Sequence, residues 1–568
     1  MIKKHFSRCP PWLSIFIFCF CFMASLVPFI CLLLFLSNTF QSAHAVEPLV
    51  NLGYVEYKGV ENPGGVTQWL GMRYAAPPLG NLRFSAPEDP VKEKKKQRAD
   101  KFGHSCLATR SVPRKHTSED CLFINVYGPS NSKSDSKLPV YFYIQGGGFN
   151  ANAGARLNGT GLVEASGMNI IVVTFNYRVG LYGFLASKEI REKASLNNGL
   201  KDQMKALEWV NKHIKQFGGD PGHVTIGGDS AGAASVYYLL SAFGGRGVNT
   251  FHAAAAGSPS FGTQLNIRES QYMYDNLVKN TKCTGKDSLA CLRKVDVKRM
   301  QKLDQRYPLP GGISPPLFMY SPTVDGYLIQ DYTYKLFARG QFKKVPMIFG
   351  ADNNEGTVFV PRNTSSFKES DTFLKNQFPA MKKKHFRKIH ELYPKTNDVF
   401  PEAKRKYGPY WRQGSNAYGE MRYNCPAIIL TVAGSMHGDP SKVWNFHYDV
   451  EDPPAMKNGI GVPHTAHMAA IWGPKYAYGP GSYRGKGVNA PIVPVVQGYW
   501  TSFIRSYDPN IHRVKGSPVW GTVTTAKTGK ALHQLYVKTR KTKTRLIDKK
   551  QIERCEYLLR VGAEELKM

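Results

Sequence analysis

Three apolar runs and one amphipathic segment dominate the pattern of the first half of the chain. Residues 139–145, 169–175 and 223–227 are mostly apolar, have the length of strands, and are rich in β-branched and aromatic side chains. Residues 202–214 instead place apolar side chains three and four positions apart, which is typical of an amphipathic helix. A strand, helix, strand succession predicts a parallel sheet with right-handed crossovers. We therefore expect an α/β fold with a central, mostly parallel sheet flanked by helices.

The N-terminus has a different pattern. Residues 12–36 carry no charge, follow three basic residues, and precede a small-x-small cleavage site that ends at Ala45. These features predict a signal peptide over residues 1–45 and a secreted, extracellular protein. The uncharged run of 25 residues is also long enough to span a bilayer, so an uncleaved membrane anchor is the alternative. Because no repeat or long linker divides the rest, we expect one catalytic domain over residues 46–568.

The cysteines and glycosylation sequons also favour export. The cysteines beyond the apolar run are Cys106, Cys121, Cys283, Cys291, Cys425 and Cys555. The first two and the next two are close enough for each pair to close a short disulfide loop in an oxidising compartment. The sequence leaves the pairing of the last two open. Sequons begin at Asn158 and Asn363 and predict glycosylation there.

The charge excludes some partners. The net charge is +33, and loss of residues 1–45 would lower it only to +30. The basic residues are scattered, and no zinc-finger or RNA-binding signature accompanies them, so we expect no nucleic-acid partner. A solvated basic face is the simpler interpretation of this excess, and adsorption to anionic lipid or polysaccharide surfaces is the sharper alternative. No cysteine pair has the C-x-x-C spacing of a zinc site, and we expect neither metal nor cofactor.

A nucleophile motif follows the third predicted strand. Residues 228–232 read G-x-S-x-G, and residues 233–240 after them predict a helix. Glycines are needed on both sides because the nucleophile of such an elbow lies on a strained strand-to-helix turn. Ser230 is therefore a candidate nucleophile, and the alternative is a serine in an ordinary surface turn.

A glycine run after the first predicted strand supplies candidate oxyanion donors. The backbone N–H groups of Gly147 and Gly148, together with that of Ala231 after the nucleophile, could form an oxyanion hole. Each such donor lowers the barrier of acyl transfer by roughly 3 kcal/mol. The alternative is a phosphate-binding loop, which the missing G-K-[ST] disfavours.

Several further motifs in order carry a family resemblance. They are residues 74–80, 82–84, 118–127, 176–178 and 217–221. With the elbow, they make the chain similar to the type B carboxylesterase/lipase family, the α/β-hydrolases that include cholinesterases, and most of all to its secreted fungal carboxylesterases. The resemblance implies an α/β-hydrolase fold and a serine hydrolase that acts on small-molecule or lipid carboxylic esters without a cofactor.

The resemblance also implies the partners of the nucleophile. The family order is Ser, Glu, His, and the family's acid segment matches Glu355, with Asn354 in place of the usual Asp. Its histidine segment, G-x-x-H, matches His464. We expect Glu355 to orient His464, which acts as the base toward the serine. Asp352 is the rival acid, and His467 occupies a position that usually holds Glu.

Two departures from the family bear on the substrate. The loop between Cys106 and Cys121, residues 107–120, is similar to the family's first disulfide loop but has only 14 residues and no aromatic side chain. This disfavours a choline site and a long interfacial lid, so we expect an esterase, with a lipase as the alternative. A non-catalytic, cholinesterase-like binding protein is a weaker alternative, since the three positions of the catalytic triad are filled by Ser230, Glu355 and His464. The family also has an auxiliary serine after the strand that follows the elbow. The resemblance places Ala256 at that position, so we expect this serine to be missing.

Overall fold

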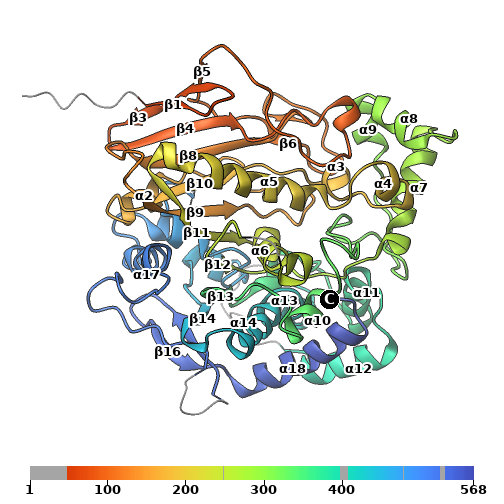
Figure 1. The fold of residues 1–568 in the computed structure, drawn as a ribbon. Helices are drawn as coiled ribbons and strands as arrows, with labels where there is room; N and C mark the ends of the chain where they lie inside the picture. The colour runs from red at the N-terminus through yellow and green to blue at the C-terminus, as the bar shows by residue number, and fades with distance from the viewer. Residues whose placement is uncertain (1–47, 247–248, 397–406, 478, 525–530) are drawn as a thin grey trace, which may run out of the picture. The chain divides into compact units, whose positions relative to one another are not determined.

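In the computed structural model, eleven strands form one twisted sheet, with the N-terminal strands at one edge and the C-terminal strands at the other (Figure 1). In spatial order the strands are β16 (Lys543–Leu546), β15 (His533–Val537), β14 (Val443–Tyr448), β13 (Met347–Asp352), β12 (Ala253–Gly257), β11 (Gly219–Asp229), β9 (Leu138–Ile144), β10 (Ile171–Phe175), β8 (Phe123–Pro129), β4 (Val66–Arg73) and β3 (Val60–Asn62). The strands from β15 to β10 in this order run parallel, and the outer ones pair antiparallel.

The sheet is buried on both faces, as the continuous apolar runs predict. Along β9, Val140, Phe142 and Ile144 pack into one core, while Tyr141 and Tyr143 pack into the other. The main covering helices are α5 (Asn198–His213), α6 (Ala231–Ser241) and α14 (Cys425–His437) on the first face, and α2 (Thr160–Ala165), α16 (Met468–Trp472) and α17 (Ile492–Ser506) on the second. The expected α/β fold with a mostly parallel sheet is thus confirmed.

The three predicted strands are β9, β10 and β11, and the predicted helix is α5. This helix begins at Asn198, four residues before the periodic pattern, and ends at His213. The apolar pattern does not predict this extra turn, because a tertiary contact stabilises it: the Asn198 amide donates to the Phe84 carbonyl at 2.8 Å. Strand β11 likewise extends beyond the apolar run at both ends.

Smaller elements complete the fold. The remaining strands are β1 (Leu49–Asn51), β2 (Glu56–Lys58), β5 (Gln97–Arg98), β6 (Ser105–Cys106) and β7 (Thr117–Ser118). The remaining helices are α3 (Gly180–Phe184), α4 (Lys188–Lys193), α7 (Ile267–Thr281), α8 (Ser288–Lys294), α9 (Val297–Leu303), α10 (Thr333–Ala338), α11 (Phe367–Gln377), α12 (Lys383–Leu392), α13 (Trp411–Gly419), α15 (Pro453–Lys457) and α18 (Lys549–Glu564). A π-helical turn, Glu420–Asn424, connects α13 to α14.

Three disulfides join the described cysteines. Two of them close the short loops singled out by the sequence, Cys106–Cys121 and Cys283–Cys291. The third, Cys425–Cys555, ties α14 to α18 across 130 residues of sequence. Of the two sequon asparagines, Asn363 is exposed and Asn158 is half-buried.

The structure describes residues 48–568, except for 247–248, 397–406, 478 and 525–530. The leader predicted over residues 1–45 lies outside them. The described residues fall in one compact unit, Pro48–Met568. No helix within this part of the chain combines the length and the apolarity that crossing a membrane requires.

Candidate active site

Ser230 lies on a tight turn between β11 and α6. Its backbone adopts φ +55° and ψ −121°, a strained conformation for a residue with a side chain. The glycines on both sides are sterically required: a Cβ at Gly232 would lie 1.9 Å from the Ile144 oxygen, and one at Gly228 would lie 2.6 Å from the same atom. The strand-to-helix turn that the G-x-S-x-G motif predicts is thus present at Ser230, between β11 and α6.

Ser230, His464 and Glu355 form one hydrogen-bonded chain. The His464 Nε2 lies 2.8 Å from the Ser230 Oγ, and its Nδ1 contacts a carboxylate oxygen of Glu355. The three residues follow β11, β14 and β13, so they meet at the carboxyl edge of the parallel strands, where α/β sheets generally place their sites. The structure therefore brings together the three residues that the family resemblance selected.

Aromatic side chains pack around the His464 imidazole. The ring of Tyr423 lies 4.3 Å from it and that of Phe359 5.1 Å, measured between centroids. The His464 side chain is consequently only 9% exposed. This packing limits the ring to an orientation in which its two nitrogens face Ser230 and Glu355.

Asn354 fixes the loop that carries His464. Its backbone N–H donates to the Val462 carbonyl at 2.9 Å, and its side-chain oxygen accepts from the Val462 N–H at 2.9 Å. The residue that departs from the family pattern therefore clamps the histidine loop beside Glu355. The carbonyl oxygen of an asparagine suits this task, since it accepts the backbone N–H without adding a charge.

Ser258 corrects the expectation that the auxiliary serine is missing. Its hydroxyl lies 2.5 Å from Glu355 Oε1, and the Asp352 N–H donates to the same oxygen at 2.8 Å. Ala256, where the sequence comparison placed the serine, is a core residue on β12. The missed signal was the polar residue directly after an alanine-rich strand, at the edge of the sheet where the other site residues lie.

His467 and Asp352 form a second, buried pair. The His467 Nδ1 lies 2.9 Å from Asp352 Oδ2, and its backbone N–H donates to Oδ1 at 3.1 Å. Burial opposes the charged imidazole, but the neighbouring carboxylate of Asp352 outweighs it and raises the pKa of His467, with Asp229 and Glu355 adding to the effect. Asp352 thus pairs with His467 and not with His464.

The candidate oxyanion donors Gly147 and Gly148 follow Gly146, where a Cβ would lie 2.9 Å from the Ser230 Cβ. Gly147 and Gly148 adopt φ +121° and +61°, and a Cβ at Gly147 would lie 2.0 Å from the Ala151 oxygen. Within the described residues, the N–H groups of both glycines donate to no protein acceptor. Ala231 is the first residue of α6, where N–H groups lack intrahelical acceptors. These three N–H groups are therefore free to bind an anionic oxygen.

Asp229, directly before Ser230, is a buried carboxylate that the sequence analysis did not single out. The Tyr143 hydroxyl donates to it, and the imidazoles of His467 and His464 lie near enough to act on it electrostatically. Burial raises the pKa of Asp229, while the Tyr143 bond and the two histidines act in the opposite direction. Ser230 therefore has a buried carboxylate directly before it in the chain, in addition to the His464–Glu355 pair.

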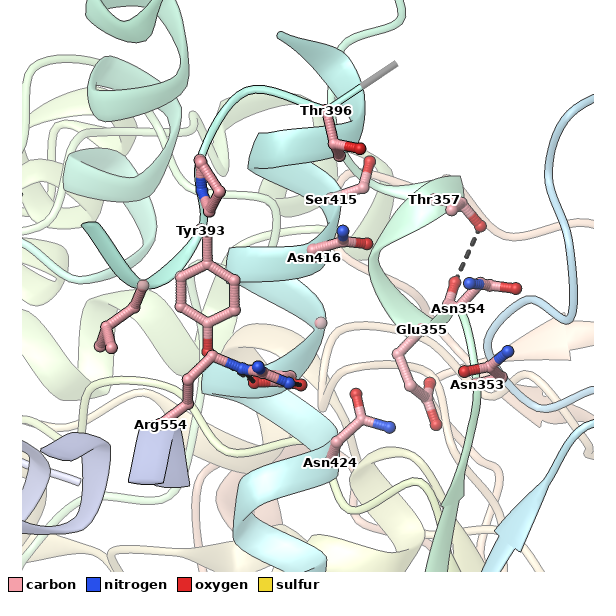
Figure 2. A pocket seen from close by; sticks show the side chains of 14 residues that line it. Asn353, Asn354, Glu355, Thr357, Tyr393, Thr396, Ser415, Asn416, Asn424 and Arg554 are labelled. Carbon is pink, nitrogen blue, oxygen red and sulfur yellow. Dashed lines mark hydrogen bonds and ion pairs between the residues drawn. The ribbon is translucent and has the colours of Figure 1, made fainter. Parts of the chain in front are cut away.

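A polar cavity of about 330 Å³ lies beside Glu355 (Figure 2). Side chains of Asn354, Ser415, Asn424 and Arg554 are among those that line it. Ser230 and His464 do not line it, so this is not the space where an ester must lie to react. In the described part of the chain, no group of His, Cys, Asp or Glu side chains is arranged to hold a metal ion.

Comparisons with known proteins identify the family. The carboxylesterase family matches residues 48–557. Secreted lipase 4 of Gibberella zeae is 31% identical over 486 residues, which cover 81% of this chain and 82% of that protein. Fumonisin B1 esterase of Sphingopyxis macrogoltabida is 34% identical over 434 residues, 74% of this chain and 72% of that protein.

A solved structure extends the agreement to three dimensions. The crystal structure of Aspergillus niger EstA superposes with a TM-score of 0.88 at 38% sequence identity, covering 93% of this chain and all of that one. The expected α/β-hydrolase fold is thus confirmed, and with it the expected family. The chain belongs to the carboxylesterase family and is an ester hydrolase.

Proposed function

We propose that the protein is a secreted serine hydrolase that cleaves carboxylic esters through an acyl-enzyme on Ser230. The observation that carries the proposal is the hydrogen-bonded chain from Ser230 through His464 to Glu355, with free N–H groups beside the serine. A strained turn, an oriented imidazole and unpaired donors in one place are the parts that acyl transfer needs.

The geometry supports the following steps. The Ser230 Oγ attacks the ester carbonyl carbon while the His464 Nε2 accepts the hydroxyl proton. The carbonyl oxygen becomes an oxyanion bound by the N–H groups of Gly147, Gly148 and Ala231. When the intermediate collapses, the carbon–oxygen bond to the alcohol breaks and His464 protonates the departing oxygen. Water, deprotonated by the same imidazole, then attacks the acyl-enzyme and releases the acid and Ser230.

Glu355 has a positioning role in this cycle. Its carboxylate faces the His464 Nδ1, which fixes the tautomer that leaves Nε2 able to accept the serine proton. Ser258 and the Asp352 N–H hold the other carboxylate oxygen, so the carboxylate cannot turn away. It also stabilises the imidazolium that forms during each transfer.

An esterase is favoured over a lipase by the short disulfide loop. Thr109 in this loop binds Asn150 through both its N–H at 2.8 Å and its hydroxyl at 3.0 Å. Asp120 at its end forms a two-point ion pair with Arg73. A loop tied down at these points is poorly suited to open as a lid. The lipase remains the second candidate because several relatives are named lipases.

The test is hydrolysis of p-nitrophenyl esters of graded chain length, followed by neutral tributyrin below and above its solubility limit. We expect ordinary saturation with short, dissolved esters and no jump in rate when droplets appear. The net charge of about +30 could adsorb the enzyme to anionic droplets, so the assay uses two salt concentrations, since salt screens charge over about 8 to 10 Å. A sharp activation above the solubility limit at both concentrations would establish the lipase.

The nucleophile is tested separately. An organophosphonate should label the wild type at Ser230 and leave the Ser230→Ala variant unlabelled and inactive, with the fold retained by circular dichroism. Labelling of another serine, or undiminished turnover by the variant, would contradict the mechanism.

Secretion is supported by the disulfides of the structure and by relatives that are named as secreted. Mass mapping of protein recovered from the medium should find these disulfides without reduction and a mature N-terminus near Val46. Peptides from residues 12–36 in that material would establish the membrane anchor, and free thiols would argue against export.

A further inference from the structure

Arg422 is a buried cation without a partner anion. Its residue is only 7% exposed, and no carboxylate of the described residues lies within ion-pair distance of it. Its one hydrogen bond is from Nε to the Ser260 Oγ at 3.0 Å. Two other buried arginines, Arg83 and Arg178, each bind a carboxylate through two nitrogens. Burying a charge without a partner anion is costly, so the free Nη groups of Arg422 favour an anionic ligand.

The guanidinium lies beside the candidate oxyanion hole. It stacks on the Phe318 ring at 5.2 Å from the ring centroid, and that ring lies directly against Gly148, where a Cβ would come within 2.2 Å of it. The Nη1 atom lies over Gly262, where a Cβ would lie 2.6 Å away. Ser260, which accepts from Arg422, itself donates its N–H to the Ser230 carbonyl. Arg422 is thus built into the wall of the site by residues that also shape the nucleophile turn.

Arg422 and Gly148 line the same small cavity. Its free volume is about 20 Å³, close to what one water molecule needs, so a small polar group fits there and a long alkyl chain does not. The lining includes Gly148, a candidate oxyanion donor, but neither Ser230 nor His464, so the cavity borders the site and does not hold the reacting ester bond itself. Because His464 must face the departing alcohol, we assign this cavity to the acyl side of the ester.

We propose that Arg422 binds a carboxylate carried by the acyl group, so that the preferred substrates are half-esters of dicarboxylic acids. This inference rests on the proposed function of Ser230. The Nη1 and Nη2 groups form no hydrogen bond within the described protein, and a guanidinium presents such N–H groups as a planar fork that matches a carboxylate. A neutral acyl chain would leave the buried cation unpaired, and leaving a buried charged group unsatisfied is unfavourable.

The experiment compares two ethyl esters of equal acyl length, monoethyl glutarate and ethyl pentanoate, at about pH 8, where the carboxylate is ionised. The readout is the ratio of their kcat/KM values, which does not depend on the fraction of folded enzyme. We expect the wild type to favour the glutarate ester by about tenfold or more, the effect of one charge-assisted hydrogen bond. Arg422→Gln should lower the ratio by about 10- to 100-fold, and Arg422→Lys by less, because lysine keeps the charge without the fork.

Two controls sharpen the result. Arg98→Gln removes the same charge from a side chain that is 81% exposed on β5, and it should leave the ratio unchanged. A pair with the carboxylate on the alcohol side, 3-acetoxypropanoate and butyl acetate, should show no preference for the charged ester. A wild-type ratio near one for the glutarate pair, a ratio that Arg422→Gln does not change, or a preference on the alcohol side would each overturn the proposal.

Failure of this inference differs from failure of the proposed function. If ethyl pentanoate is hydrolysed and the organophosphonate labels Ser230, but no carboxylate preference appears, only the role of Arg422 is wrong. If neither ester is hydrolysed and Ser230 is not labelled, the proposed function itself fails and the role of Arg422 fails with it.

Discussion

Two histidine–carboxylate pairs lie next to each other, and their members are three residues apart in sequence. Both carboxylates contact the Ser258 hydroxyl, yet only one of the two imidazoles reaches Ser230. His464 pairs with Glu355 and places its Nε2 2.8 Å from Ser230. His467 pairs with Asp352 and directs its Nε2 at Gly257, where a Cβ would lie 2.4 Å away. The chemistry of the two pairs is the same, and the position of the second imidazole nitrogen makes the difference.

The comparison teaches that a titratable pair can serve stability or catalysis according to what its free nitrogen faces. The His467 side chain is 2% exposed and is surrounded by the carboxylates of Asp352, Asp229 and Glu355. In its protonated form it therefore offsets buried negative charge beside the acid of the other pair. His464 instead lies at the wall of the site, where its second nitrogen can exchange a proton.

The largest effect should come from removing the imidazole that faces the nucleophile. His464→Ala should lower kcat by about 10⁴- to 10⁶-fold, because in the described part of the chain the Ser230 Oγ has no hydrogen-bond partner other than His464 to accept its proton. His467→Ala should keep most of the turnover per active site, titrated with an organophosphonate. Greater damage to turnover from His467→Ala would reverse the roles of the two pairs.

The next effect separates the two acids. Glu355→Gln should lower kcat by about 10⁴-fold, because the amide no longer fixes the tautomer of His464 or stabilises its charged form. Asp352→Asn should lower kcat far less, since the Asp352 carboxylate pairs with His467 and it is Glu355 that contacts His464. The measurement is kcat per titrated active site for both variants, and the opposite ranking would make Asp352 the acid.

The two histidine variants should rank in the opposite order for stability, with His467→Ala losing more unfolding free energy than His464→Ala. His467→Ala leaves the Asp352 carboxylate buried without its cation, and breaking such a pair costs about 3–5 kcal/mol of unfolding free energy. Denaturant unfolding should show this loss, and Asp352→Asn in the same background should restore part of it. Equal losses from His464→Ala would remove the distinction between a structural pair and a catalytic one.

The smallest effect is a difference in pH dependence. Because the folded state raises the pKa of His467, the stability from its charge is fully present below its ordinary pKa of about 6.5. That stability is lost as the pH rises through the raised folded value. The gap in unfolding free energy between wild type and His467→Gln should therefore shrink with rising pH. Asp229, Asp352 and Glu355 are present in both proteins, and a constant gap would mean that His467 is uncharged.

The sequence and the family resemblance predicted Ser230 and the His464–Glu355 pair, but they did not predict that His467 pairs with Asp352. The elbow around Ser230 was predictable because steric conflict at Gly228 and Gly232 leaves only glycine there. Glu355 and His464 came from the family resemblance, since the spacing alone did not choose among 42 acidic residues and 15 histidines. Ser258 was missed because a serine after a strand looks like any turn residue until its acceptors are known.

The sequence by itself determined the fold class, the strand-to-helix elbow and the glycine-rich oxyanion segment, because each depends on local backbone sterics and apolar patterning that neighbouring residues encode. Only the tertiary structure decided which acid faces which histidine and that the buried Arg422 has no carboxylate partner among the residues that the structure describes. These features depend on residues more than 100 positions apart meeting at the edge of one sheet, and on the burial that makes an unpaired charge costly. Sequence spacing carries no measure of either.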